Sequence, residues 1–194
     1  MPSPIAHLSV GYAIYRHYQN KLSAQPTQGW KLPLQMILAT GLSLLPDLDV
    51  IPAFIFRDMQ RYHNNFSHSL LFAVPVAFVL AVIFHRIYRS NFWLWFLVCL
   101  LSYDLHVLMD ALTAERGVMM FWPLTDARFA SPIKLFYGLQ WGLGWLSIWH
   151  LWTIFTESLF GLLILLVMNY FEKRRNQSSG HTTSFSQRRR GRIQ

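Results

Sequence analysis

Long apolar stretches separated by short polar segments dominate the chain. Three of them, residues 69–84, 92–112 and 145–171, approach or exceed the roughly 20 residues that a helix needs to cross a bilayer core, once interfacial flanks are counted. Two shorter apolar runs, residues 4–15 and 32–45, are marginal for a crossing. The pattern predicts an all-α integral membrane helical bundle of about four crossings, with three long spans and two shorter N-terminal helices.

The composition agrees with a protein embedded in lipid. Hydrophobic residues make up 53% of the 194 residues and charged residues 13%, whereas charged residues are about a quarter of a typical soluble domain. The single cysteine, Cys99, lies inside an apolar run, so no disulfide can form within one chain. No basic residue precedes the first apolar run, and we therefore expect the N-terminus to be retained rather than removed as a secretory signal.

The net charge of +8 depends largely on the C-terminal segment. Seven of the 17 basic residues follow residue 171, among Ser, Thr, Gln and Gly residues that are too polar to pack. A basic segment directly after a span is typical of the cytoplasmic side, where it contacts anionic lipid, and we favour this interpretation over nucleic-acid binding. We predict a membrane-embedded domain over residues 1–172 and a basic, disordered cytoplasmic tail over residues 173–194.

The distribution of basic residues also predicts an orientation. Crossings that alternate from a cytoplasmic C-terminus place twelve of the 17 basic residues inside and five outside. The bias depends heavily on the tail, and the inverted orientation is the alternative.

Histidine and aspartate residues gather at the predicted outer ends of four segments. Ionisable groups at membrane depth are costly, so they indicate function by default. The residues are His7 in the first segment, Asp47 and Asp49 after Pro46 in the second, His63 and His68 before the third, and His106 and Asp110 near the end of the fourth. On this topology, all of them lie at one face of the membrane.

This set of residue types predicts a metal site. His106 and Asp110 are four residues apart on a helix, so their side chains point from the same face. Mixed His and carboxylate ligands without thiolate suit zinc best here, with manganese or iron as alternatives, and more than four ligands suit two ions. Taken singly, the His106 and Asp110 pair can instead be a structural hydrogen bond, and Asp47 and Asp49 a turn after Pro46.

Four further residues are candidates for supporting roles. Asp104 lies about 200° around the helix from His106, which suits a supporting partner better than a ligand. Glu157 is an acid inside the last span and either completes the site or packs against another polar group. The aromatic loop of residues 117–129 resembles an interfacial lid, in which Asp126 and Arg128 are candidates for contact with substrate. An aromatic belt at the interface is the alternative interpretation.

The positions of these residues resemble a known family. The matching pieces are His7 with Gly11, Leu-Leu-Pro-Asp-Leu-Asp over residues 44–49, residues 63–71, the His106-x-x-x-Asp110 pair, and Phe-Trp-Pro-Leu-Thr-Asp-Ala-Arg-Phe over residues 121–129. The sequence thereby resembles the YdjM-like family of LexA-regulated, bacterial inner-membrane proteins that are predicted metal-dependent hydrolases. The family's usual His-Arg-Gly-x-Thr-His-Ser is replaced here by His-Asn-Asn-Phe-Ser-His-Ser over residues 63–69.

The order of these residues is also similar to that of bacterial zinc-dependent phospholipase C, an all-helical enzyme. That looser resemblance implies five metal ligands, His7, Asp47, His68, His106 and Asp110, with Asp47 also orienting the attacking water as a catalytic residue. His63 and Asp49 would then lie in or next to the ligand set.

These observations lead to one functional prediction and two alternatives. We predict a membrane-bound hydrolase in which a metal-activated water attacks a phosphoester, with a membrane phospholipid as a candidate substrate and no nucleic-acid partner. The chain contains no Gly-rich phosphate loop, Gly-x-Ser-x-Gly or His-Glu-x-x-His, which argues against nucleotide hydrolysis, serine hydrolysis and classical zinc proteolysis. The alternatives are a non-catalytic protein with a structural metal or His/Asp network, and a small transporter that uses Asp104, Asp110 and Glu157 as a relay.

Overall fold

The computed structural model of the protein describes residues 2–22, 31–114, 116–139 and 147–190. Within these ranges the chain forms helices and no strand. The α-helices are α1 (Pro4–Leu22), α2 (Lys31–Gly41), α3 (Val50–Ile55), α4 (Met59–Tyr62), α5 (Leu70–Tyr88), α6 (Phe92–Ala111) and α7 (Ile148–Arg190). Three 3-10 turns, η1 (Leu42–Leu44), η2 (Pro46–Asp49) and η3 (Phe66–His68), lie between them. The all-α prediction is confirmed.

Among the described residues, three helices are long and apolar enough to cross a membrane: α5, α6 and the Ile148–Arg175 part of α7. They correspond to the three predicted long spans, although the predicted start at Trp145 lies outside the described residues. The segments Pro33–Leu44 and Pro46–Ile55 form a fourth candidate span that is bent by 62°. Pro46 lies at the bend because proline cannot continue the hydrogen bonds of a helix.

Helix α1 is longer than its apolar run predicts, since it continues past residue 15 to Leu22. Its last turns are polar, and they remain against the bundle because Arg16 donates a hydrogen bond to Glu172 of α7. Nearer the start of α1, a Cβ atom at Gly161 of α7 would lie 2.5 Å from Ser9 Oγ, so α1 and α7 are in close contact there. An interhelical ion pair and a small residue thus extend α1 beyond what hydropathy alone indicates.

Helices α5 and α6 form a tight pair. Ser69 caps α5 by accepting hydrogen bonds from the main-chain N–H groups of Leu71 and Phe72, and Asn91 caps α6 through Leu94 N–H. Ala73, Ala77 and Ala81 recur every fourth residue on α5 and are almost fully buried, which allows the two helices to approach closely.

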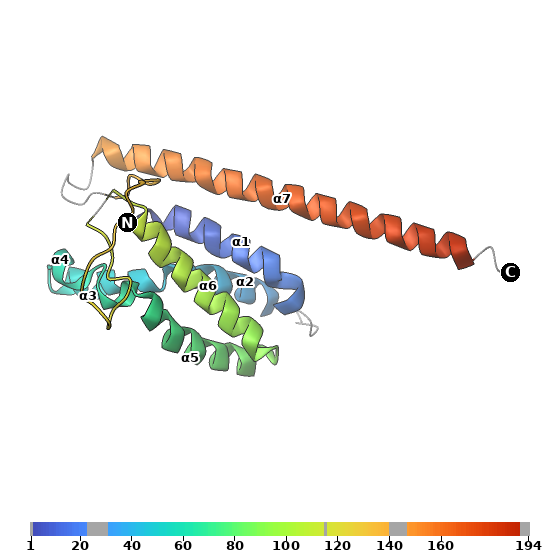
Figure 1. The fold of residues 1–194 in the computed structure, drawn as a ribbon, viewed down its shortest axis with the longest axis horizontal. Helices are drawn as coiled ribbons and strands as arrows, with labels where there is room; N and C mark the ends of the chain where they lie inside the picture. Colours follow the sequence, from blue (N-terminus) through green and yellow to red (C-terminus); the bar gives the residue numbers. More distant parts are fainter. Residues whose placement is uncertain (1, 23–30, 115, 140–146, 191–194) are drawn as a thin grey trace.

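The long helices lie side by side, and their ends define the two ends of the bundle (Figure 1). The start of α1, the end of α6 and the short helices α3 and α4 lie at one end, whereas the C-terminal part of α7 projects past the other. The helix continues through the basic segment to Arg190, where the sequence predicts disorder. Our division of the chain at residue 172 stays a prediction.

Residues 112–114 and 116–139, which form no helix, cover the end of the bundle where α6 finishes. Their main chain is held by isolated bridges between Thr113 and Phe136 and between Val118 and Phe129. They also join the start of α5, because Leu70 N–H donates to Met120 O at 3.0 Å and Ser69 Oγ donates to Trp122 O at 2.6 Å. These residues therefore fix where α5 begins.

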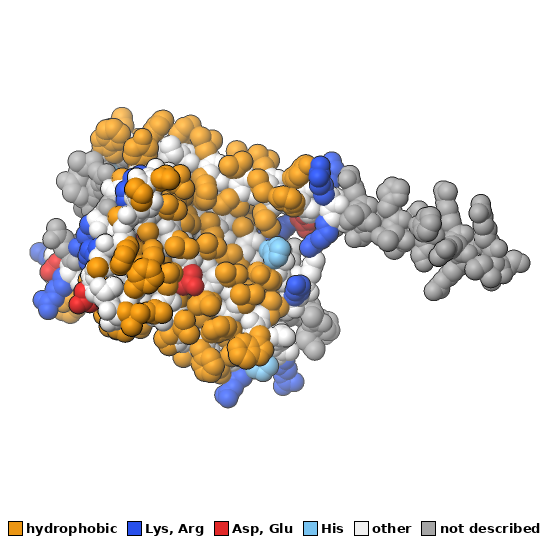
Figure 2. Space-filling view, viewed as in Figure 1, with side chains coloured by type: hydrophobic (Ala, Val, Ile, Leu, Met, Phe, Trp, Pro, Cys, Tyr) orange, Lys and Arg blue, Asp and Glu red, His pale blue; other side chains and the backbone are white. Residues whose placement is uncertain are grey.

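The outer surface is apolar between charged ends. Figure 2 shows a broad band of hydrophobic side chains across one face, with Lys and Arg side chains gathered toward the two ends of the band. Large apolar side chains are exposed on every long span, for example Phe78 on α5, Trp93 on α6 and Leu163 on α7. In water such a surface would be unstable, so it is the surface that lipid covers.

Candidate metal centre

Four separate elements bring histidines and aspartates to one point at the end of the bundle. α1 contributes His7 from its second turn, and η2 contributes Asp47 and Asp49 directly after Pro46. His68 ends η3, and His63 lies just before that turn. α6 contributes His106 and Asp110 from its last turns. The convergence predicted from the sequence is therefore present.

The ligand atoms of four residues lie within 4.8 Å of one another: Asp47, His68, His106 and Asp110. His68 Nε2 lies 3.0 Å from Asp110 Oδ2 and 3.5 Å from Asp47 Oδ1. His106 Nε2 lies 3.3 Å from Asp110 Oδ2 and 3.4 Å from Asp47 Oδ1. Ligand atoms around a tetrahedral zinc ion are about 3.3–3.6 Å apart, given metal–ligand bonds of about 2.0–2.2 Å. The spacing of the four side chains fits such an ion.

His7 extends this group. Its Nε2 lies 3.5 Å from Asp110 Oδ1, and its ring stacks on His106 with the ring centroids 3.8 Å apart. His7 is completely buried, yet neither of its ring nitrogens has a hydrogen-bond partner among the described residues. A buried histidine without partners is costly, so the position suits a fifth ligand.

The hydrogen bonds at the back of each ring fix which nitrogen faces the centre. His106 Nδ1 lies 2.6 Å from the main-chain carbonyl of Ser43, and a carbonyl only accepts, so Nδ1 carries the proton. His68 Nδ1 lies 3.1 Å from Asp49 Oδ2. In the neutral rings, both Nε2 atoms therefore present lone pairs to the centre, as metal-binding histidines do.

Asp49 holds the histidines rather than facing the centre. Its Oδ1 lies 2.6 Å from His63 Nδ1, and its Oδ2 accepts hydrogen bonds from Asn64 N–H at 3.1 Å and Ser67 Oγ at 2.5 Å. With both oxygens occupied, Asp49 orients His63 and His68. A second group of candidate ligands, Asp47, Asp49, His63 and His68, nevertheless also lies within 4.8 Å.

Unsatisfied polar atoms mark the space that an ion would fill. Both carboxylate oxygens of Asp47 and of Asp110 are buried without a hydrogen-bond partner among the described residues, and so is His63 Nε2. Buried polar groups are almost always paired in native proteins. Because the unpaired atoms are all carboxylate oxygens and imidazole nitrogens, the residues fit a divalent cation.

The charge on His68 responds to the same carboxylates. Burial alone would lower its pKa, but the nearby carboxylates of Asp110, Asp47 and Asp49 raise the pKa well above its usual value. In the metal-free protein, a proton on His68 thus balances part of the negative charge. Metal binding requires that proton to leave.

Gly11 allows α1 to reach the site. A Cβ atom at this position would lie 2.5 Å from Thr40 O and 2.6 Å from Ser43 Oγ, closer than real contacts allow. Gly11 is one helical turn after His7, so the close approach also brings His7 to the other ligands. This explains why the two residues occur together in the sequence pattern.

Asp104 and Glu157 lie outside both ligand groups among the described residues. Asp104 is partly exposed, and its Oδ1 has no hydrogen-bond partner there. Glu157 is buried and accepts a hydrogen bond from Ser3 N–H at 2.6 Å. It therefore fixes the chain just before α1, which indirectly places His7.

Asp126 and Arg128, the two candidates for contact with substrate, differ in their surroundings. Asp126 is exposed. Arg128 donates hydrogen bonds to the main-chain oxygens of Asn64 at 2.9 Å and Gly117 at 3.1 Å, and to the side chain of Asn65. Arg128 thus braces the loop that carries His63 and His68.

Several supporting residues could not be identified from the sequence. The Ser43 carbonyl belongs to the main chain and has no signature in the side-chain pattern. Tyr103 donates a hydrogen bond to Ser67 O, and Arg116 donates one to His63 O. Both residues therefore also hold residues 63–68, which we call the histidine loop. For Tyr103, a signal exists, because it lies three residues before His106 and therefore on a neighbouring part of the same helix face.

Comparisons with known proteins identify the family of the chain. Residues 1–176 match the family described as YdjM inner membrane protein. The chain is 32% identical over 142 residues to inner membrane protein YbcI of Escherichia coli (strain K12), which covers 68% of this chain and 73% of the relative. No solved structure matches the chain. The chain belongs to the YdjM family of inner membrane proteins.

Proposed function

We propose that the protein is a membrane-bound metal-dependent hydrolase that acts on a phosphoester, with a phospholipid head group as its substrate class. The observation that carries the proposal is the convergence of ligand atoms from His7, Asp47, His68, His106 and Asp110. Among the described residues, the ring nitrogens of His7 and the carboxylate oxygens of Asp47 and Asp110 have no hydrogen-bond partner. Zinc fits this ligand set best, and manganese and iron fit it next. Two overlapping ligand groups that share Asp47 and His68 support a site for two ions.

A divalent ion held by these residues would supply a Lewis acid and a bound water with a pKa near neutrality. Asp47 is the candidate for handling the water's proton, because 11% of its side chain is exposed while the other four ligands are almost fully buried. In the reaction, the water oxygen bonds to phosphorus and the bond to the leaving oxygen breaks. Asp47 would accept one proton from the water and return it to the leaving oxygen, which would depart as the alcohol.

The surroundings of Asp47 support a lipid substrate. α3 begins directly after Asp49, and large apolar side chains at its end are exposed: Ile55, its last residue, is 69% exposed, and Phe56, the next residue, is 63% exposed. Phe66, just before His68, is 49% exposed. Apolar side chains near Asp47 would place this end of the bundle in the membrane interface, where lipid head groups can reach Asp47.

We also propose that this centre faces the periplasm and that the C-terminus is cytoplasmic. The basis is the count of basic residues, twelve inside against five outside, for that orientation. A phospholipid of the outer leaflet of the inner membrane would then be the accessible substrate.

The direct test uses purified protein in phospholipid vesicles with zinc added back. Release of water-soluble phosphate esters is measured by mass spectrometry for wild type, Asp47→Asn and Asp104→Asn. Loss of a general base reduces rates by about 10²–10⁴-fold, so we expect that loss for Asp47→Asn and near wild-type release for Asp104→Asn. Zinc that binds without any release in any lipid would favour a structural metal.

The alternative function, a small transporter, would use Asp104, Asp110 and Glu157 as a relay. A relay needs ionisable groups in contact with one another, whereas Asp110 faces the metal centre and Glu157 contacts Ser3 N–H. If Asp104→Asn abolished ion flux through liposomes that contain the protein, that result would favour the transporter.

A further inference from the structure

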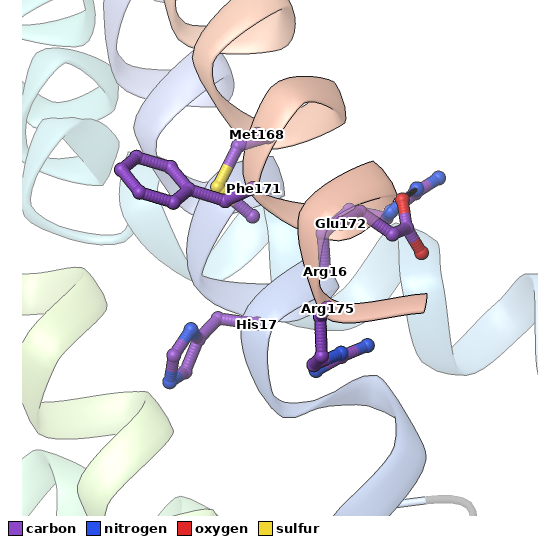
Figure 3. A pocket seen from close by; sticks show the side chains of 6 residues that line it. All are labelled: Arg16, His17, Met168, Phe171, Glu172 and Arg175. Carbon is purple, nitrogen blue, oxygen red and sulfur yellow. Dashed lines mark hydrogen bonds and ion pairs between the residues drawn. The ribbon is translucent and has the colours of Figure 1, made fainter. Parts of the chain in front are cut away.

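A second candidate site lies at the opposite end of α1 from the metal centre. A cavity of about 430 Å³ opens between the C-terminal half of α1 and the middle of α7. Figure 3 shows the side chains that line it, Arg16, His17, Met168, Phe171, Glu172 and Arg175. Its volume is within the range of about 300–1,000 Å³ typical of small-molecule pockets. His17 is ten residues after His7, so about 15 Å of helix separates the two sites.

The cavity lies at the depth where lipid head groups begin. The apolar part of α7 that can cross a membrane ends at Arg175, which is also the last residue of the cavity lining. Lys173 and Arg174 lie beside it, and Arg174 is stacked over the ring of Tyr170 at 4.8 Å. Basic and aromatic residues together are typical of the boundary between hydrocarbon and head groups.

The lining combines two kinds of surface. Met168 and Phe171 form an apolar wall, and Phe171 is 63% exposed and continues the apolar surface of α7. Arg16 and Arg175 contribute two positive charges, against one negative charge on Glu172. Arg16 donates to Glu172, so a ligand anion would compete with that carboxylate for the guanidinium groups that line the cavity.

We propose that this cavity binds the phosphate head group of an anionic phospholipid, with an acyl chain along Met168 and Phe171. Guanidinium groups form strong charge-assisted hydrogen bonds with phosphate, and basic pockets between membrane helices are suited to anionic head groups. The apolar wall favours a lipid over free phosphate, which would leave that wall without a partner. The lipid would join α1 to α7 and is independent of the proposed hydrolase.

The test is native mass spectrometry of the full-length protein in detergent, titrated with phosphatidylglycerol or with neutral phosphatidylcholine. We expect one phosphatidylglycerol molecule to be retained at concentrations where phosphatidylcholine is not. Arg175→Gln should raise the apparent dissociation constant about tenfold, the effect of losing one charge-assisted hydrogen bond. Glu172→Gln should lower the constant, because it removes the carboxylate that repels the lipid and occupies Arg16.

Arg86→Gln is the matched control, since Arg86 is exposed in the last turn of α5 and lies outside the cavity. Equal losses for Arg86→Gln and Arg175→Gln would overturn the proposal in favour of general surface attraction. Equal retention of both lipids would exclude recognition of the head-group charge. Displacement by inorganic phosphate at concentrations equal to the lipid would identify a free-phosphate site. Opposite shifts in the Gln variants at residues 172 and 175 would support the proposal, because a variant that merely unfolds cannot tighten binding.

Discussion

His68 Nε2 and His106 Nε2 lie 3.3 Å apart at the centre of the buried cluster. Each ring has its Nδ1 against an oxygen, at Asp49 for His68 and at the Ser43 carbonyl for His106. Two lone pairs at this distance repel each other unless a proton or a metal ion lies between them. One proton cannot also satisfy the oxygens of Asp47 and Asp110, which have no hydrogen-bond partner among the described residues. A metal ion can.

The first prediction concerns metal content. We expect wild type to contain near-stoichiometric zinc or manganese. The double variant His106→Ala with Asp110→Ala lacks two ligands of the centre and should contain none. Elemental analysis of the purified protein measures this. Asp104→Asn changes a carboxylate on the same helix outside both ligand groups and should keep its metal. Well-folded wild-type protein that binds no metal even after metal is added would contradict the prediction.

The second prediction concerns Asp49, which contacts both His63 and His68. Asp49→Asn leaves the five proposed ligands of the central ion in place but replaces one accepting oxygen by a donor, so His68 loses its orientation. Removal of such a supporting partner typically weakens metal affinity about 10–100-fold. Competition with a chromogenic chelator gives the affinity.

Asp58→Asn is the control for Asp49→Asn, because Asp58 accepts a hydrogen bond from Arg61 N–H and is outside both ligand groups. Its metal affinity should equal that of wild type. If Asp49→Asn also bound metal as tightly as wild type, the orienting role of Asp49 would be refuted.

The third prediction compares two glycines. Gly11→Ala would place a Cβ atom 2.5 Å from Thr40 O and separate α1 from η1, so we expect a loss of about 1–3 kcal/mol of stability and weaker metal binding. Gly41→Ala meets nothing within 4 Å and should stabilise the helix by up to about 1 kcal/mol. Thermal unfolding followed by circular dichroism distinguishes them, and equal effects would contradict the close approach.

The fourth prediction concerns Glu157 and Ser3. Glu157→Ala leaves the buried Ser3 N–H without its acceptor, which costs about 1–3 kcal/mol. Glu157→Gln keeps an oxygen that accepts the same hydrogen bond and should lose less stability. The midpoint of thermal unfolding measures both variants. A relay through Glu157 would instead lose its function in both variants alike, because neither Ala nor Gln can ionise.

The fifth prediction concerns orientation. A fluorescent protein fused after Gln194 should fold and fluoresce, and alkaline phosphatase fused at the same position should be inactive, because the C-terminus is expected in the cytoplasm. Active alkaline phosphatase at this position would invert the proposed topology and place the metal centre on the cytoplasmic face.

The sequence by itself determined the spans and the residue types of the site. Whether a segment can cross a membrane depends on its own length and apolarity, which are local properties, and the three long spans follow from them. The His and Asp residues stand out for a related reason, since polar side chains next to apolar spans are expensive. The apolar run of residues 4–15 does not show that α1 continues to Leu22, where Arg16 in its polar part contacts Glu172 of α7, 156 residues away.

The tertiary structure alone decided how those residues work together. His68 and His106 are 38 residues apart in the chain, and the Ser43 carbonyl that orients His106 is 63 residues from it. Such contacts depend on how helices pack, and no periodicity in the sequence encodes them. The same holds for Arg128, whose bonds to the histidine loop appear only in three dimensions, and for the cavity between α1 and α7. Hydropathy is local, whereas the geometry of a site depends on packing between distant segments.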